Sequence, residues 1–165
     1  MEIRPIAPDD GDAYRMILED TSEEDRYCRF FHAVDHFEPE FIEESVARPD
    51  AIGFIAFDGT EPLGTAHAIP IDGGLAELAI IVAKSGRRQG VARALLERVV
   101  EEARKRGVGE LLGYALRINV PFSMLARGFG MIPDQMSDGA TVTWRLALRP
   151  TTVTTKTSDF SRVEW

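Results

Sequence analysis

The apolar residues of the chain follow two different periods, and these periods divide it into predicted strands and helices. Alternating or unbroken apolar runs predict strands at residues 2–6, 51–57, 63–70, 78–82, 111–116, 131–135 and 141–148. Apolar spacing of three to four residues predicts helices at residues 9–19, 22–34, 40–47, 91–106 and 119–130. This interleaved order predicts an α/β (α+β) fold with about seven strands.

The turns between these segments predict how the strands pair. Asp58-Gly59 is a strong hairpin signal, and the Asp72-Gly73-Gly74 turn leads into the strand at 78–82. The first three strands should therefore reach this central strand as an antiparallel meander. The strand at 111–116 follows a helix, so a right-handed crossover should make it parallel to the central strand. We expect one domain over residues 1–149 with a mixed, mostly antiparallel sheet, followed by a tail at 150–165.

The stretch from the central strand into the next helix has an unusual charge pattern. Residues 78–96 contain no acidic residue, although the whole chain has 27 acids against 19 Lys plus Arg. Four cations lie here, close to a helix N-terminus that should repel them: Lys84, Arg87, Arg88 and Arg93. A bound anion would explain the cluster, with backbone N–H groups contributing and Gly86 and Gly90 allowing close approach. The alternative is a solvated basic turn.

Residues 87–92, Arg-Arg-Gln-Gly-Val-Ala, resemble the R/Q-x-x-G-x-G/A signature of the GNAT superfamily of N-acetyltransferases. The flanking strand and helix and a second block at 119–131 extend the resemblance over most of residues 3–148. It implies a GNAT fold, in which two central strands splay apart, with acetyl-CoA as donor and its pyrophosphate held at the turn. The cofactor-binding residues that the resemblance implies are Ile80, Ile81, Val82, Arg87, Arg88, Gln89, Gly90, Val91, Ala92, Arg93, Asn119 and Ser123.

The second block departs from the family pattern at a position that matters for catalysis. GNAT proteins commonly read N-x-x-A-x-x-L-Y-x-x-x-G-F here, and the tyrosine often protonates the departing thiolate. In this chain Ala126 stands at the tyrosine position and Met131 replaces the final phenylalanine. The general acid is therefore not identified. Asn119 can be explained as a helix N-cap as well as by a contact with the cofactor.

Residues 22–31, Ser-Glu-Glu-Asp-Arg-Tyr-Cys-Arg-Phe-Phe, are similar to a helix motif of bacterial Pat-type protein lysine acetyltransferases. In those GNAT domains the helix borders the acceptor side of the cleft, and the tyrosine is likewise absent. A simpler interpretation of this segment is burial in the core. Four apolar residues at helical spacing would form the buried face: Tyr27, Phe30, Phe31 and Val34.

Acetyl transfer to an amine requires a neutral nitrogen, and a lysine amine has an ordinary pKa of about 10.4. Glu77, at the start of the buried strand, is the predicted general base and matches a glutamate proposed for that role in Pat-type domains. His67 on the neighbouring strand is the second candidate. Backbone N–H groups near Ile81 and Val82 could polarise the thioester carbonyl. A covalent route through Cys28 is disfavoured by its place in the aromatic helix.

Composition limits the function further. With 165 residues, 44% apolar content and a formal net charge of −8, the chain is expected to form one acidic domain that does not bind nucleic acid. One cysteine cannot form an internal disulfide, and three dispersed histidines predict no metal site. Without a signal peptide or an apolar run near 18 residues, we expect a soluble cytoplasmic protein with no membrane partner.

We therefore predict an acetyl-CoA-dependent N-acetyltransferase whose amine acceptor is a protein lysine. One alternative is a small-molecule acetyltransferase acting on a polyamine, an amino acid or an antibiotic. Another is an acyl-CoA-binding sensor without turnover. The tail at 150–165 is expected to pack on the domain or on a partner chain, for which a homodimer is one arrangement.

Overall fold

The computed structural model describes residues 1–134 and 139–149. The predictions made for Gln135, for the turn at Ser137 and Asp138, and for the tail at 150–165 fall outside the described residues. Within the described ranges, no helix combines the length and the apolar character needed to cross a membrane.

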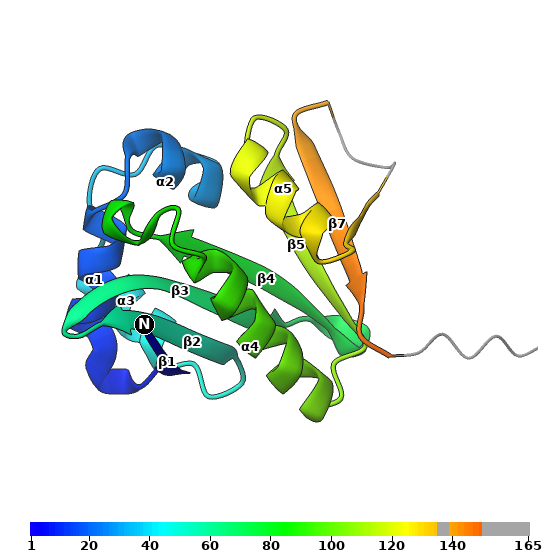
Figure 1. Ribbon diagram of the computed structural model, residues 1–165, viewed down its shortest axis with the longest axis horizontal. Coiled ribbons are helices and arrows are strands. Elements are labelled where there is room, and N and C mark those ends of the chain that lie inside the picture. The colour runs from blue at the N-terminus through cyan, green and yellow to red at the C-terminus, as the bar shows by residue number, and fades with distance from the viewer. Residues whose placement is uncertain (135–138, 150–165) are drawn as a thin grey trace, which may run out of the picture.

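Seven strands within the described ranges form one sheet, in the order β1-β2-β3-β4-β5-β7-β6 (Figure 1). β4 and β5 are parallel, and every other neighbouring pair is antiparallel. This arrangement confirms the predicted fold class and the parallel crossover. The strands are β1 (Glu2–Pro5), β2 (Ile52–Asp58), β3 (Glu61–Pro70), β4 (Leu75–Val82), β5 (Glu110–Leu116), β6 (Ile132–Pro133) and β7 (Thr141–Ala147).

Helices cover both faces of this sheet (Figure 1). One core lies under α4 and α5, where Leu95, Leu96 and Val99 of α4 are fully buried. The second core lies under α1 and α3 on the opposite face, around Ile17 and Ile55. The helices are α1 (Gly11–Glu19), α2 (Glu23–Phe30), α3 (Pro39–Val46), α4 (Val91–Lys105) and α5 (Val120–Gly128).

α2 is shorter than the sequence predicted. It ends at Phe30, because Phe31 takes a left-handed conformation with φ 63°. Phe30 packs against Phe37 at a ring distance of 5.6 Å, but Tyr27 and Phe31 are 45% and 39% exposed. The prediction that these aromatic residues form a buried face is therefore wrong. The apolar spacing extends across a helix end, so the residues do not share one face.

The sheet separates between β4 and β5. These strands pair only over residues 75–78 and 110–113, after which β4 continues beside β3 and β5 continues beside β7. The separation begins at Gly113, where an added Cβ would lie 2.7 Å from Cζ of Phe122 in α5. The ring of Phe122 thus packs directly on the backbone at this point. Beyond it, each strand presents one edge without a strand partner among the described residues, as the resemblance implied.

A buried carboxylate joins the first strand to the start of α1. Asp10, only 5% exposed, accepts hydrogen bonds from Arg4 Nη2 at 2.6 Å, Arg4 Nη1 at 2.8 Å and the backbone N–H of Ala7 at 2.7 Å. The hydrogen bonds from the Arg4 side chain, followed by the one from Ala7, lower the pKa of Asp10 against the opposing effect of its burial. This carboxylate therefore stabilises the fold when it is ionised.

We predict that Asp10→Asn lowers the free energy of unfolding by roughly 1–3 kcal/mol at neutral pH, because it weakens buried hydrogen bonds to a charge. Since folding lowers the pKa of Asp10, its contribution is present above the ordinary value of 3.8 and is lost as the pH falls through the folded-state pKa. Urea unfolding of both proteins at neutral and acidic pH measures this difference.

The neighbouring exposed carboxylate offers a matched control, Asp9→Asn, which should change the free energy of unfolding by less than about 0.5 kcal/mol. Equal losses in the two variants, or a difference that does not shrink in acid, would contradict the role of Asp10.

Candidate functional site

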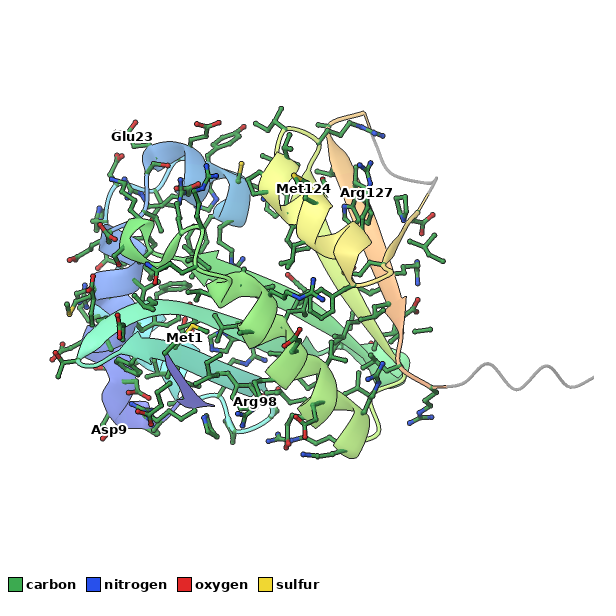
Figure 2. All side chains as sticks on the ribbon, viewed as in Figure 1. Met1, Asp9, Glu23, Arg98, Met124 and Arg127 are labelled. Carbon is green, nitrogen blue, oxygen red and sulfur yellow. The ribbon has the colours of Figure 1, made fainter. Side chains whose placement is uncertain are left out.

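A cleft of about 720 Å³ occupies the wedge between β4 and β5. Its walls include residues 77–82 of β4, the turn that leads into α4, the inner side of α2 and the first turns of α5. α2 and α5 stand on the two sides of the open end of the wedge (Figure 1). Glu23 on α2 and Met124 on α5 mark these two sides (Figure 2). Glu77 and all the predicted cofactor-binding residues line the cleft, except Gln89 and Ser123. The second candidate base, His67, and Lys84 of the cation cluster do not line it.

Residues 79–82 of β4 form the long wall of the cleft. They pair with residues 64–67 of β3 and with no other strand of the described chain. Backbone N–H and C=O groups of alternate residues in such a strand point toward the unpaired edge. The predicted contact segment Ile80, Ile81 and Val82 lies on this edge and can therefore pair with an extended polar ligand.

The turn after β4 is built by two glycines with different roles. Gly86 is buried against β3, and an added Cβ would lie 2.6 Å from the carbonyl oxygen of Leu63. Its small size thus serves the packing of the turn on the sheet. Gly86 also lines the cleft, so its role in letting an anion approach stays a prediction. Gly90 has φ 75° and precedes the first residue of α4, Val91. Arg88 also has positive φ, 59°, which is uncommon for a residue with a side chain.

The start of α4 carries a run of backbone donors without partners. Among the described residues, no acceptor faces the backbone N–H groups of residues 88–93, and no side chain caps the helix. A helix N-terminus with free N–H groups and the positive end of the helix dipole is a favourable anion site. The turn therefore has the chemistry to bind a phosphate or pyrophosphate.

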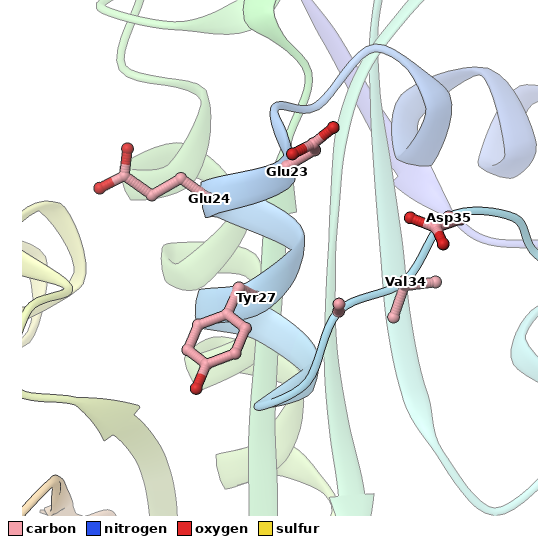
Figure 3. A pocket seen from close by; sticks show the side chains of 6 residues that line it. Glu23, Glu24, Tyr27, Val34 and Asp35 are labelled. Atoms are coloured by element: carbon pink, nitrogen blue, oxygen red, sulfur yellow. The ribbon is translucent and has the colours of Figure 1, made fainter.

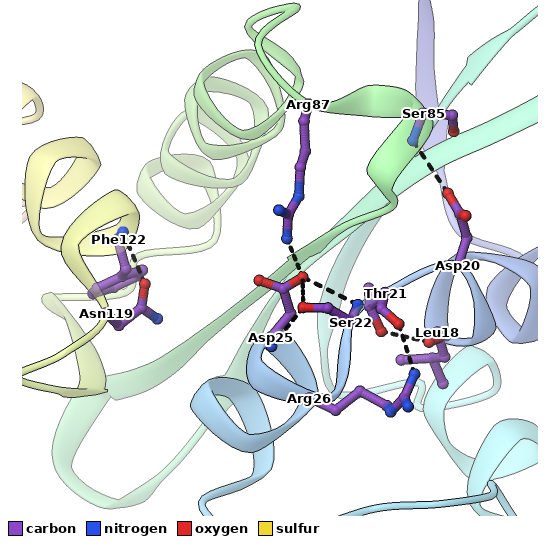
Figure 4. A network of polar contacts seen from close by, with 10 residues as sticks. All are labelled: Leu18, Asp20, Thr21, Ser22, Asp25, Arg26, Ser85, Arg87, Asn119 and Phe122. Atoms are coloured by element: carbon purple, nitrogen blue, oxygen red, sulfur yellow. Dashed lines mark hydrogen bonds and ion pairs between the residues drawn. The ribbon is translucent and has the colours of Figure 1, made fainter.

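The basic cluster at this turn is only partly unpaired. Arg87 forms an ion pair with Asp25 of α2, whose Oδ2 also accepts a hydrogen bond of 2.6 Å from Ser22 Oγ (Figure 4). Arg93 pairs with Glu97 at 3.2 Å. The turn thus does have an acidic neighbour, Asp25, which lies far away in the sequence. Gln89 donates to the backbone oxygen of Ser85 at 2.6 Å, so its side chain belongs to the turn itself.

Three charged side chains in the cleft have no hydrogen bond or ion pair with any described residue: Arg29, Glu77 and Arg88. They lie on three different elements. Arg88 is exposed at the anion-binding turn, and Arg29 is partly buried in the last turn of α2. Glu77 is partly buried on β4 opposite Leu112, one residue before the last pair that joins β4 to β5. The cleft therefore offers a free cation at one end and a free carboxylate at its closed end.

The other candidate groups for proton transfer or nucleophilic attack are less suitable. His67 is only 7% exposed and does not line the cleft, and its Nε2 has no partner within the described part of the chain. Burial, and then the charge of Arg29, lower the pKa of His67 to about 4. Cys28 lines the cleft, but burial and two nearby acids raise the pKa of its thiol, which disfavours the reactive thiolate.

The opposite wall combines the predicted Asn119 with two residues that the motifs did not predict, Tyr114 and Met124. Asn119 accepts a hydrogen bond of 3.1 Å from the backbone N–H of Phe122, so it caps α5 while it lines the cleft (Figure 4). Ala126 is buried in the core at 1% exposure. Tyr114 of β5 and Met124 of α5 line the cleft and are 42% and 68% exposed. Their positions depend on where the sheet separates, which no local pattern predicts.

A separate, smaller hollow of about 280 Å³ lies on α2 and the loop that follows it (Figure 3). Glu23, Glu24 and Asp35 give it an acidic lining, beside Tyr27 and Val34. It shares no lining residue with the large cleft. The anion-binding turn and the unpaired charges described above therefore belong to the cleft between β4 and β5 and not to this hollow.

Comparisons with known proteins agree with this architecture. Residues 14–122 match the model of the Acetyltransferase (GNAT) family. The GNAT domain of S. lividans PAT is 25% identical, with a TM-score of 0.83 over 88% of this chain and 89% of that one. This similarity confirms the Pat-type resemblance seen in the sequence.

Two further solved structures share the fold at lower identity. Ribosomal-protein-alanine N-acetyltransferase from Brucella melitensis is 23% identical, with a TM-score of 0.73 over 89% of this chain and 99% of that one. The PaiA N-acetyltransferase from Thermoplasma acidophilum, in complex with coenzyme A, is 18% identical, with a TM-score of 0.70 over 88% of this chain and 98% of that one. The chain belongs to the GNAT family of acetyltransferases, enzymes that use acetyl-CoA as the acetyl donor.

Proposed function

We propose that this chain transfers the acetyl group of acetyl-CoA to the side-chain amine of protein lysines, with Glu77 as the general base. The observation that carries this proposal is the arrangement of the free charges in the cleft. Glu77 stands without a partner among the described residues at the closed end of the wedge, and Arg88 stands without one at the anion-binding turn.

The donor fits this arrangement along the length of β4. Its pyrophosphate would bind the free N–H groups of residues 88–93 and the guanidinium of Arg88. Its pantetheine arm would pair with the free edge of β4 at residues 80–82. The thioester would then lie near the point where β4 and β5 separate, beside Glu77. Gln89 and Ser123 lie outside the cleft lining and are assigned no contact with the donor.

The proposed reaction is direct attack on the thioester carbon. The lysine nitrogen forms the new C–N bond while the C–S bond breaks, and the amine proton passes to the carboxylate of Glu77, directly or through water. The leaving thiolate takes its proton from solvent, because Ala126 supplies no acid at the position where the family has tyrosine. A base in hydrogen-bond reach of the amine contributes about 10²–10⁴-fold to the rate.

A polypeptide acceptor is supported by the rim of the cleft. Phe31, Tyr114 and Met124 expose large apolar surfaces there, from three different elements. Exposed apolar groups around a cleft are typical of surfaces that bind other proteins. The resemblance of residues 22–31 to a helix motif of Pat-type protein lysine acetyltransferases also supports a protein acceptor. Acetylation of a small amine is the second candidate, and the acceptor experiment below distinguishes the two.

Arg88→Glu should raise the dissociation constant of acetyl-CoA by about tenfold or more, because it replaces an attractive charge at the pyrophosphate with a repulsive one. Calorimetric titration measures this change. Arg104→Glu reverses the charge of another exposed arginine, at the other end of α4, and should leave the affinity within about twofold. Equal affinity in wild type and Arg88→Glu would contradict the placement of the pyrophosphate.

Transfer of labelled acetyl from acetyl-CoA into a cell extract tests the acceptor and the base together. We expect label in the protein fraction, at lysine side chains, and a loss of about 10²-fold or more in Glu77→Gln with acetyl-CoA affinity nearly unchanged. Glu61→Gln, an exposed change on β3, is the matched control and should transfer normally.

Label found only in small molecules would contradict a protein acceptor and support a small-molecule acetyltransferase. Full transfer by Glu77→Gln would remove Glu77 from the mechanism. Tight binding of acetyl-CoA without transfer to any fraction would support the sensor alternative.

A further inference from the structure

Arg29 is a charged residue in the cleft to which the proposed reaction gives no role. It lies in the last turn of α2 and lines the same cleft as Glu77. Its guanidinium carbon lies 5.0 Å from the centre of the Phe30 ring, and its side chain is partly buried. A partly buried cation ordinarily has an anionic partner, because loss of water raises the free energy of the charge.

The chain places one possible partner beside Arg29 and uses it elsewhere. Asp25 is four residues earlier in α2, the spacing at which an acid and a base pair on a helix surface. Its carboxylate instead accepts from Ser22 and pairs with Arg87 at the anion-binding turn (Figure 4). Arg29 is therefore left one helical turn further along the cleft, without a counter-ion among the described residues.

The charge of Arg29 acts on the same side of the sheet as Glu77. It lowers the pKa of His67, and it opposes the rise that burial causes in the pKa of Tyr14. His67 of β3 is the strand partner of Ala79, which points to the same face of β4 as Glu77, two residues away. Two residues of a strand span roughly 7 Å. Arg29 and Glu77 thus lie on the same side of the sheet and line the same cleft.

We propose that Arg29 is a specificity-determining residue that binds a carboxylate of the acceptor, so that the enzyme prefers amines with an acidic group close by. In a protein this group would be an Asp or Glu side chain next to the acetylated lysine. In free lysine it would be the α-carboxylate. The inference rests on the proposed function, since it assigns Glu77 to the amine and Arg29 to the neighbouring anion.

Kinetics with paired acceptors test this inference. The first three peptides are acetyl-Gly-Asp-Lys-Ala-amide and its two variants with Asn or Lys in place of Asp. Three further peptides have Asp, Asn or Lys directly after the acceptor lysine. Free lysine and lysine amide form the small-molecule pair. For one of the two Asp positions, before or after the lysine, wild type should show about tenfold higher kcat/KM with Asp than with Asn. One charge-assisted contact has an effect of this size.

The variants then assign this preference to Arg29. Arg29→Gln should remove the preference for Asp, and the change should appear in the KM for the acceptor. Arg29→Lys should retain part of the preference, and Arg29→Glu should prefer the peptide with Lys beside the acceptor lysine. The affinity for acetyl-CoA should stay within about twofold in all three, because Arg29 forms no hydrogen bond or ion pair with the described residues of the anion-binding turn. Arg104→Glu is the control and should keep the wild-type preference.

The outcomes separate the inference from the proposed function. Lysine transfer with the same flanking preference in wild type and Arg29→Glu would overturn the role of Arg29 and leave the lysine acetyltransferase standing. Weakened acetyl-CoA binding in Arg29→Gln would assign the residue to the donor and also overturn the inference. Preference for free lysine over lysine amide, with no peptide used, would keep the carboxylate contact and overturn the protein acceptor. Transfer to none of these amines would overturn both proposals.

Discussion

The cleft depends on one interruption of backbone hydrogen bonding, the separation of β4 from β5 after residues 78 and 113. A sheet that stayed paired would leave no space between these strands and no free edge. Phe122 packs on the backbone at Gly113, where no side chain could be accommodated beside it. The strands remain stable because β3 and β7 still pair with them on the other side. The separation thus leaves backbone N–H and C=O groups free to bind a ligand in the middle of a sheet whose faces are covered by helices.

Charge pairing then divides the cleft into regions. The ion pair between Arg87 and Asp25 joins the anion-binding turn to α2 and neutralises one of the four cations near the start of α4. Arg93 is neutralised on its own helix by Glu97. Among the described residues that line the cleft, three charges have no hydrogen bond or ion pair: Arg88 at the turn, Glu77 on β4 and Arg29 on α2. Ionic groups without partners in a cleft have a free-energy cost, which a ligand of complementary charge removes.

Much of this architecture could be predicted from the sequence, because it is encoded in local patterns. Period-two runs, the Asp58-Gly59 turn and the amphipathic pattern from Val91 gave the strands, their pairing and α4. The R/Q-x-x-G-x-G/A match and the residues around it identified the family before any geometry was known. The placement of Glu77 at the closed end of the wedge followed from its position next to the strand predicted at 78–82, although β4 begins earlier, at Leu75.

The rest could not be predicted, because it depends on contacts between distant segments. The pairing of Arg87 joins residues 62 positions apart, and the burial of Gly86 depends on a backbone oxygen of β3. α2 ends at Phe30, because Phe31 takes a left-handed conformation that the apolar spacing did not indicate. Tyr27 and Phe31 therefore lie at the surface and not in the expected core. The free charge of Arg29 likewise depends on the ion pair between Asp25 and Arg87, which lies in the turn before α4.

Backbone amide NMR of the protein titrated with acetyl-CoA tests the central claim, that the edge of β4 and the following turn hold the donor. The account predicts large shifts and slowed hydrogen exchange for the amides of residues 88–93 and for those at the free edge of residues 80–82, with the amides of β1 unchanged. Binding that leaves the amides of residues 80–82 and 88–93 unperturbed would contradict it.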